Sequence, residues 1–186
     1  VSQRYRLAAA QLEANHEGGM LRVPRIAGRI WGGSFDGNAF ADARAQRVVL
    51  KANASNIDIE SALRDVAQKD ILEGTGRVTL DLDSAGKSVN EMKSRLGGKA
   101  ALQLRDGAVK GINLARTLRE AKAAISMKQD SVQQARGAEK TDFSEMSASF
   151  DIDEGVARSK DLDIKSPFLR IGGEGAVDIG RNRIGY

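Results

Sequence analysis

The sequence contains no cysteine, one histidine and two prolines among its 186 residues. The absence of cysteine excludes disulfide bonds, thiolate metal sites and a cysteine nucleophile. A Ser-His-Asp arrangement would have to use His16, and no Gly-x-Ser-x-Gly motif accompanies it. The sequence also lacks a His-Glu-x-x-His motif and an acidic Ca²⁺ loop. We therefore expect a protein that is not an enzyme, with no catalytic residues, no cofactor and no metal site.

Aromatic residues make up only 4% of the chain, so its apolar surface must be mainly aliphatic. No apolar run approaches the roughly 18–20 residues that a membrane-spanning helix needs. The net charge is +4, from 29 basic and 25 acidic residues, and the basic residues stand singly. We expect solvated charges and no nucleic-acid binding, and the small excess leaves weak attraction to anionic lipid head groups open.

Both ends of the sequence fall within strand-like segments. The chain begins at Val1 and ends at Tyr186. We therefore expect residues 1–186 to be a single fragment of a larger protein. A membrane anchor, if the protein has one, is expected to lie outside this fragment.

Aliphatic and polar residues alternate along several segments. In 77–83 every second residue is aliphatic, which places those side chains on one face of a strand. Similar runs recur downstream, and one lies at 48–54. This alternation is typical of antiparallel sheets with one wet face. The run at 77–83 and those downstream supply the candidate lining of an apolar groove: Val78, Leu80, Leu82, Ala100, Leu102, Leu104, Met146, Ala148, Phe150, Ile152, Leu162, Ile164, Leu169, Ile171, Val177 and Ile179.

Gly-containing segments between these runs indicate turns. Asp-Gly pairs favour hairpins because glycine tolerates a positive φ. We predict turns at 105–107 and 153–155, where the sequences are Arg-Asp-Gly and Asp-Glu-Gly, and two more at 16–19 and 36–38. Strand, tight turn and strand thus follow one another, as in a long meander.

Helical spacing of apolar residues interrupts the strand pattern in three places. We predict short helices over 59–69, after an N-cap at Ser88, and from Asn113 to about Ser126. The polar segment 126–141 is expected to be a mobile loop. The predicted fold is a β-rich α+β fold, a curved antiparallel β-meander (an open groove or taco-like sheet) with about three short helices.

An apolar sheet face must be hidden from water, and the sequence leaves two ways open. The face either packs as a closed core or curls into an open trough that accepts acyl chains. Small and aliphatic residues dominate the expected lining, and such walls suit lipid tails, which carry no polar group to be recognised.

Several segments resemble the AsmA family of bacterial envelope proteins. The strings Leu-Arg-Asp-Gly-Ala-Val-Lys-Gly-Ile-Asn-Leu at 104–114 and Lys-Thr-Asp-Phe-Ser-Glu-Met-Ser-Ala-Ser-Phe at 140–150 carry the resemblance, with further matches at 74–82 and 166–175. Upstream, 30–35 is similar to a short aromatic-Gly-Gly segment of the family, with Trp31 where tyrosine is more usual.

The resemblance implies the periplasmic region of a protein held in the bacterial inner membrane by an N-terminal helix, which lies outside this fragment. It also implies a role in outer-membrane biogenesis, since relatives look like long β-grooves that carry phospholipids between membranes. The family has no catalytic residues to transfer to this chain.

Three functions follow as hypotheses. The first is a segment that holds or passes phospholipid acyl chains along an apolar β-groove. The second is a structural or adaptor module that binds another envelope protein through exposed strand edges. The third is an enzyme with ionisable groups clustered around His16 or with a buried Ser/Lys pair.

Overall fold

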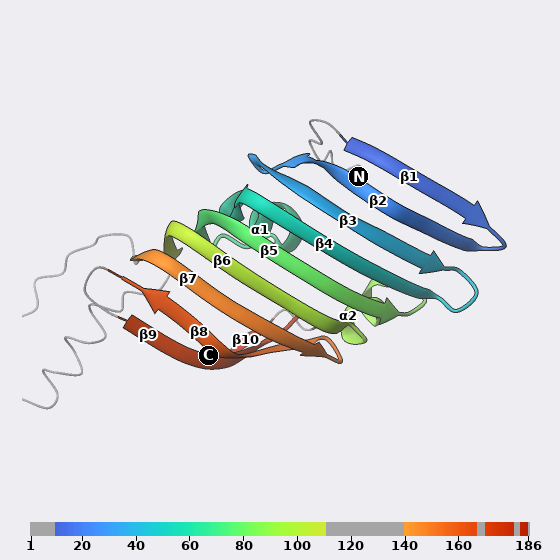
Figure 1. Ribbon diagram of the computed structural model, residues 1–186. Coiled ribbons are helices and arrows are strands. Elements are labelled where there is room, and N and C mark those ends of the chain that lie inside the picture. Colours follow the sequence, from blue (N-terminus) through green and yellow to red (C-terminus); the bar gives the residue numbers. More distant parts are fainter. Residues whose placement is uncertain (1–9, 111–139, 167–169, 181–182, 186) are drawn as a thin grey trace, which may run out of the picture.

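The computed structural model describes residues 10–110, 140–166, 170–180 and 183–185. Within these residues, ten strands form one sheet whose spatial order follows the chain from β1 to β10 (Figure 1). Every neighbouring pair is antiparallel, which confirms the predicted meander. The strands are β1 (Ala10–Glu17), β2 (Met20–Ile30), β3 (Gly33–Asp42), β4 (Arg47–Asp58), β5 (Leu72–Ala85), β6 (Gly97–Lys110), β7 (Lys140–Asp153), β8 (Val156–Lys165), β9 (Arg170–Asp178) and β10 (Arg183–Gly185).

Two of the three predicted helices fall on described residues, and both are confirmed. They are α1 (Ile59–Ala67), between β4 and β5, and α2 (Val89–Ser94), between β5 and β6. Neither of these described helices has the length and apolarity to cross a bilayer. The third predicted helix, at 113–126, lies outside the described residues, as does 126–139 of the expected loop. The last two positions of that loop, Lys140 and Thr141, begin β7.

Local signals explain where α1 begins and ends. Asp58 is the N-cap, and its carboxylate accepts a hydrogen bond of 2.7 Å from the Ser61 backbone N–H. Gln68 takes a left-handed conformation with φ of 54° and closes the last turn. The Trp31 indole, in the β2–β3 turn, donates to Asp65 Oδ2 at 2.8 Å and so fastens α1 to that turn.

The predicted turns divide into right and wrong ones. The turn at 153–155 is confirmed, because Glu154 and Gly155 both have positive φ between β7 and β8. The turn predicted at 16–19 is narrower, since His16 still belongs to β1. The prediction at 36–38 is wrong, because this segment lies inside β3.

The Asp-Gly pair at 106–107 also lies inside a strand, so the predicted turn there is wrong. Asp106 has φ of 51°, but β6 continues through it to Lys110. The pairing with β5 shifts at this point, since Thr75 faces Arg105 and Glu73 faces Ala108. The positive φ therefore produces a β-bulge, the other structure that Asp-Gly sequences favour.

The core lies where one cross-strand row meets α1. Cα partners run across β4 to β9 at this level, in the order Ile57, Gly76, Leu104, Met146, Ile164 and Ile171. Directly opposed residues share a sheet face, so these side chains form one row. Ile59 and Ala62 of α1 are buried together with Ile57, Leu104 and Ile164 of this row. At Gly76 a Cβ atom would lie 1.9 Å from the Gln103 carbonyl oxygen, so only glycine fits.

We expect the replacement of a leucine in this core to lower the free energy of unfolding more than the replacement of a leucine outside it. Leu104 is 1% exposed, whereas Leu80 is only half-buried. Leu104→Ala should lower the free energy of unfolding by about 2–5 kcal/mol. Leu80→Ala should cost clearly less, because water already reaches its side chain. Urea unfolding followed by circular dichroism measures both. Equal losses would contradict the placement of the core at the α1 end.

Candidate functional site: a partly covered apolar face

The strand register gathers the alternating aliphatic residues on one side of the sheet. Ala52, Leu80, Ala100 and Phe150 are successive Cα partners on β4 to β7, so their side chains share a face. A parallel row joins Ala54, Val78, Leu102 and Ala148, and another joins Leu50, Leu82, Gly98 and Ile152. We call this side of the sheet the apolar face and the other side the polar face.

The predicted lining residues differ in how far they are covered. Four are buried, namely Leu104, Ala148, Ile152 and Ile164. Leu169 lies outside the described residues. The others are half-buried: Val78, Leu80, Leu82, Ala100, Leu102, Met146, Phe150, Leu162, Ile171, Val177 and Ile179. Most of the predicted lining therefore remains partly open to water.

The two described helices, α1 and α2, lie at the ends of the strands and do not cover the middle of the apolar face. At one end α1 packs against the core row. At the other end the Ser84 hydroxyl donates to the Met92 carbonyl oxygen of α2 at 2.6 Å. The turn between β7 and β8 also meets α2, because a Cβ atom at Gly155 would lie 2.3 Å from the Lys93 carbonyl oxygen. Figure 1 shows the helices at opposite strand ends, behind the sheet as drawn.

Helix length explains why the cover is incomplete. With nine residues, α1 is about 14 Å long, and α2 with six residues is about 9 Å long. Ten strands at about 4.8 Å spacing span roughly 43 Å. These two helices are therefore much too short to cover the whole apolar face.

The apolar face extends beyond the predicted lining, onto β2 to β4. Ile26 pairs with Gly37, which pairs with Ala52 and so continues the row of Leu80. Phe35 continues the row of Ala54 in the same way. Alternation along β2 is broken between Val23 and Ile26, where the register shifts, so the sequence pattern conceals this part. Only the clean alternation over 48–54 points to it.

An ionic cluster fastens α1 over its end of the apolar face. Lys110 Nζ, at the end of β6, lies 2.8 Å from Glu60 Oε1 on α1, 2.5 Å from Asp70 Oδ1 and 3.3 Å from Glu73 Oε1. Lys140 Nζ on β7 lies 2.7 Å from Glu73 Oε2. The cluster thus joins α1 to three neighbouring strands.

These contacts shift the pKa values of several groups in the cluster. Hydrogen bonds from Lys140 and Lys110 hold the pKa of the Glu73 carboxyl below its ordinary value. The hydrogen bond from Lys110 lowers the pKa of Asp70 in the same way. Bonding to Asp70 and Glu60 raises the pKa of the Lys110 ammonium. Glu73, Asp70 and Lys110 are therefore charged at neutral pH.

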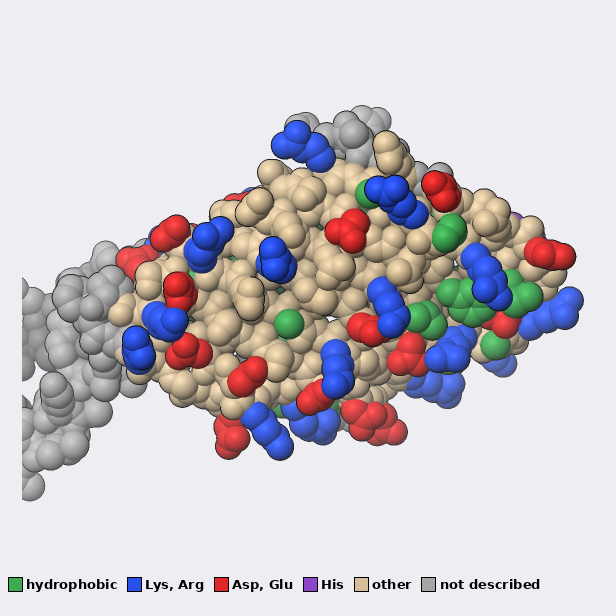
Figure 2. Space-filling model, viewed as in Figure 1, with side chains coloured by type: hydrophobic (Ala, Val, Ile, Leu, Met, Phe, Trp, Pro, Cys, Tyr) green, Lys and Arg blue, Asp and Glu red, His purple; other side chains and the backbone are tan. Residues whose placement is uncertain are grey.

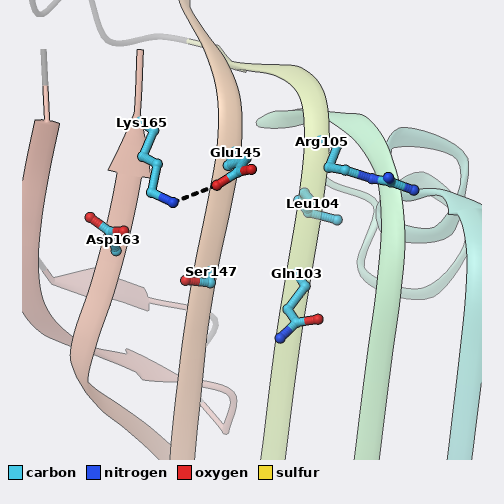
Figure 3. A pocket seen from close by; sticks show the side chains of 7 residues that line it. All are labelled: Gln103, Leu104, Arg105, Glu145, Ser147, Asp163 and Lys165. Atoms are coloured by element: carbon cyan, nitrogen blue, oxygen red, sulfur yellow. Dashed lines mark hydrogen bonds and ion pairs between the residues drawn. The ribbon is translucent and has the colours of Figure 1, made fainter.

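The polar face carries a shallow depression of about 290 Å³ over β6, β7 and β8 (Figure 3). Lys165 Nζ bonds to Glu145 Oε2 at 2.5 Å, and this bond lowers the pKa of the Glu145 carboxyl. Ser147, Asp163 and Gln103 occupy the next row, while Arg105 extends away from Glu145. The Lys165–Glu145 pair in this depression is therefore satisfied within the sheet.

Groups of three or more His, Cys, Asp or Glu side chains that could hold a metal ion are absent from the described part of the chain. His16 is exposed on β1, where it pairs with Leu21. The apolar face is therefore the candidate functional site.

One comparison with known proteins gives a match. The family model described as AsmA family matches residues 6–162, which is most of the 186-residue chain. No curated protein and no solved structure matches the chain. The family match confirms the resemblance seen in the sequence strings.

The ionic cluster predicts a loss of stability in acid. Glu73 has a lowered pKa, so its contribution to stability is present above its ordinary pKa of 4.5 and is lost as the pH falls through its lower folded value. Glu73→Gln should lower the melting temperature at pH 7 and flatten its decrease between about pH 5 and pH 3. The matched control is Asp36→Asn on β3, an exposed carboxylate outside the cluster. Equal flattening in the control would show that Glu73 has no special part in acid unfolding.

Proposed function

The chain belongs to the AsmA family, and from this premise we propose that it acts in outer-membrane biogenesis by holding or passing phospholipid acyl chains along its apolar face. Family membership fits a role in the bacterial envelope and in outer-membrane biogenesis in general. The finer proposal, that acyl chains are the ligand, is supported by the chemistry and the exposure of the apolar face.

The observation that carries this proposal is the partly exposed centre of the apolar face. Leu80, Ala100 and Phe150 stand in one row across three strands, and all three are half-buried. Their side chains have no polar atom, so they match a ligand segment that has none. Removing one methylene group from water contributes about 0.8 kcal/mol. An open face covers only one side of the chain, so contact with six methylene groups would contribute at most roughly 5 kcal/mol.

The direction of the rows suggests how a lipid would lie. Each row crosses the strands, so an acyl chain that follows a row stays on apolar side chains from β4 to β7. A charged head group gains nothing on this face and would remain at its margin in water. No catalytic step is required, because the ligand is held and released without a change in its bonds.

We place the activity in the periplasm, next to an inner-membrane anchor outside residues 1–186. This placement rests on the family and on the general role of such proteins in the envelope. The phospholipid is the expected partner.

The free strand edges support an adaptor as the second candidate function. Within the described residues, β1 and β10 are the outermost strands of an open sheet. An unpaired edge offers backbone N–H and C=O groups to a strand of another envelope protein. The register shift between Glu13 and Asn15 interrupts β1, so pairing there would be shorter than the strand. Capture of an envelope protein by the chain, without bound lipid, would favour this candidate.

An aspartate on the apolar face is expected to abolish lipid retention. Leu80→Asp places a charge in the centre of the face, and burying an unpaired carboxylate under an acyl chain is costly. The control is Thr79→Asp, one residue away on the exposed polar face. Mass spectrometry of co-purified phospholipid measures retention in each protein. We expect at least a tenfold loss for Leu80→Asp and little change for Thr79→Asp.

Circular dichroism and the melting temperature show whether both variants are folded. Unchanged lipid retention in a folded Leu80→Asp protein would contradict acyl-chain binding at the centre of the face. A similar loss in both variants would indicate that lipid associates with charge and not with the apolar rows.

A further inference from the structure

Charges of opposite sign alternate along one row of the polar face. Lys51, Asp81, Lys99 and Asp151 are successive Cα partners on β4 to β7. Lys51 Nζ lies 2.9 Å from Asp81 Oδ2, and Lys99 Nζ lies 3.9 Å from Asp151 Oδ1. Charges in this row are therefore compensated by a neighbouring strand. The turn end of β2, β3 and β4 departs from this pattern.

At that end, two apolar side chains of the polar face stand beside charged ones. Phe40 lies between Arg22 on β2 and Val49 on β4 in the register, so all three stand on the polar face. The guanidinium carbon of Arg22 lies 5.3 Å from the centre of the Phe40 ring. Phe40 and Val49 are half-buried, and no described element packs over them. Figure 2 shows hydrophobic side chains gathered at this end, with Lys or Arg around them.

Arginines outnumber carboxylates in the stretch of chain that contains this end. Residues 20–50 contain five arginines and two aspartates, with no lysine or glutamate, which is a net charge of +3. The whole chain has a net charge of only +4. All five of these arginines are exposed.

Arg25 and Arg29 lie farther along β2, so the arginines of the turn end are Arg22, Arg44 and Arg47. Three carboxylates lie at the same end: Asp83 pairs with Arg47, Asp42 accepts from backbone N–H groups of the turn, and Glu17 ends β1. Among the described residues, no carboxylate lies within ion-pair distance of Arg22 or Arg44, so these two arginines remain available to an anionic surface.

The turns make this region a projecting corner. The Ala43 backbone N–H donates to the Gly19 carbonyl oxygen at 2.9 Å and joins the β3–β4 turn to the β1–β2 turn. Arg47 is 55% exposed beside Asp83, at 3.6 Å. Leu21, on the apolar face at the same corner, is 40% exposed. Figure 1 shows the two turns at the edge of the molecule, away from α1.

We propose that this basic corner, defined by Arg22, Arg44 and Arg47 with Phe40 and Val49, docks on an anionic phospholipid bilayer. Arginines attract the negatively charged head groups, and each such residue near the surface strengthens binding several-fold. Apolar side chains at the same place enter the boundary between head groups and acyl chains, as in interfacial anchors. The corner is a second site, on the opposite side of the sheet from the proposed acyl-chain site.

Vesicle flotation tests the corner directly. The 186-residue chain is mixed, at low salt, with vesicles of phosphatidylcholine alone or with 30% phosphatidylglycerol. We expect binding only to the second kind, and weaker binding as salt is added. Arg22→Gln combined with Arg47→Gln should reduce the partition coefficient roughly tenfold. Lys51→Gln combined with Lys99→Gln removes the same charge from the same face and should change it less than twofold.

Several outcomes would overturn the proposal. Equal losses in the two double variants would mean that net charge alone attracts the chain, without a defined corner. Equal binding to both kinds of vesicle would remove the electrostatic part. Unchanged binding of Phe40→Ser, in a variant shown to be folded, would remove the apolar part. Failure to bind anionic vesicles, together with binding to an acidic protein or to nucleic acid, would reject a bilayer as the partner.

Discussion

The structure depends on one constraint. When aliphatic and polar residues alternate in matching register on neighbouring antiparallel strands, one face of the sheet is apolar. Leu80 lies opposite Ala52 and Ala100, and the pairing repeats row after row from β4 to β7. This apolar face must be covered by another part of the protein or by a ligand. Two helices of nine and six residues cover only the strand ends. The described helices therefore cover the apolar face at the two ends of the strands. The middle of the face stays partly exposed, and this part is the site proposed for acyl chains.

The polar face contributes to the same constraint from the other side. A slip of one residue between β5 and β6 would turn every side chain of one strand to the opposite face. If β6 turned in this way, Ala100 and Leu102 would leave the apolar face, and Lys99 would leave the side of Asp81. Exposed ion pairs contribute little to stability one by one. Their arrangement in rows nevertheless disfavours this slip, since Lys99 would lie opposite Leu80 or Leu82 in place of Asp81. Hydrophobic and ionic patterns thus select the same pairing.

This agreement explains how much could be predicted from the sequence. The alternation at 77–83 and 146–152 is local, so strands, faces and the meander followed from it. Asp-Gly at 106–107 was misjudged because a positive φ serves a bulge as well as a hairpin, and only the pairing of Thr75 with Arg105 decides between them. The cover of the apolar face depends on contacts distant in sequence, such as Gly155 against Lys93, and has no local signal. The basic corner also has no local sequence signal, because Phe40 lies beside Arg22 and Val49 only through the pairing of three strands.

The corner and the apolar face meet at the β3–β4 turn, and this gives the two proposals a common geometry. Val48 and Val49 are consecutive, so one side chain stands on each face, and Leu21 shares the apolar face with Val48 through Ala41. Apolar side chains on both faces of the strand ends can reach the boundary between head groups and acyl chains, while the arginines of the corner stay among the head groups. If the tip entered, the acyl region of the bilayer would border the row of Leu50 and Leu82 directly. A lipid tail would then reach the apolar face directly from the bilayer.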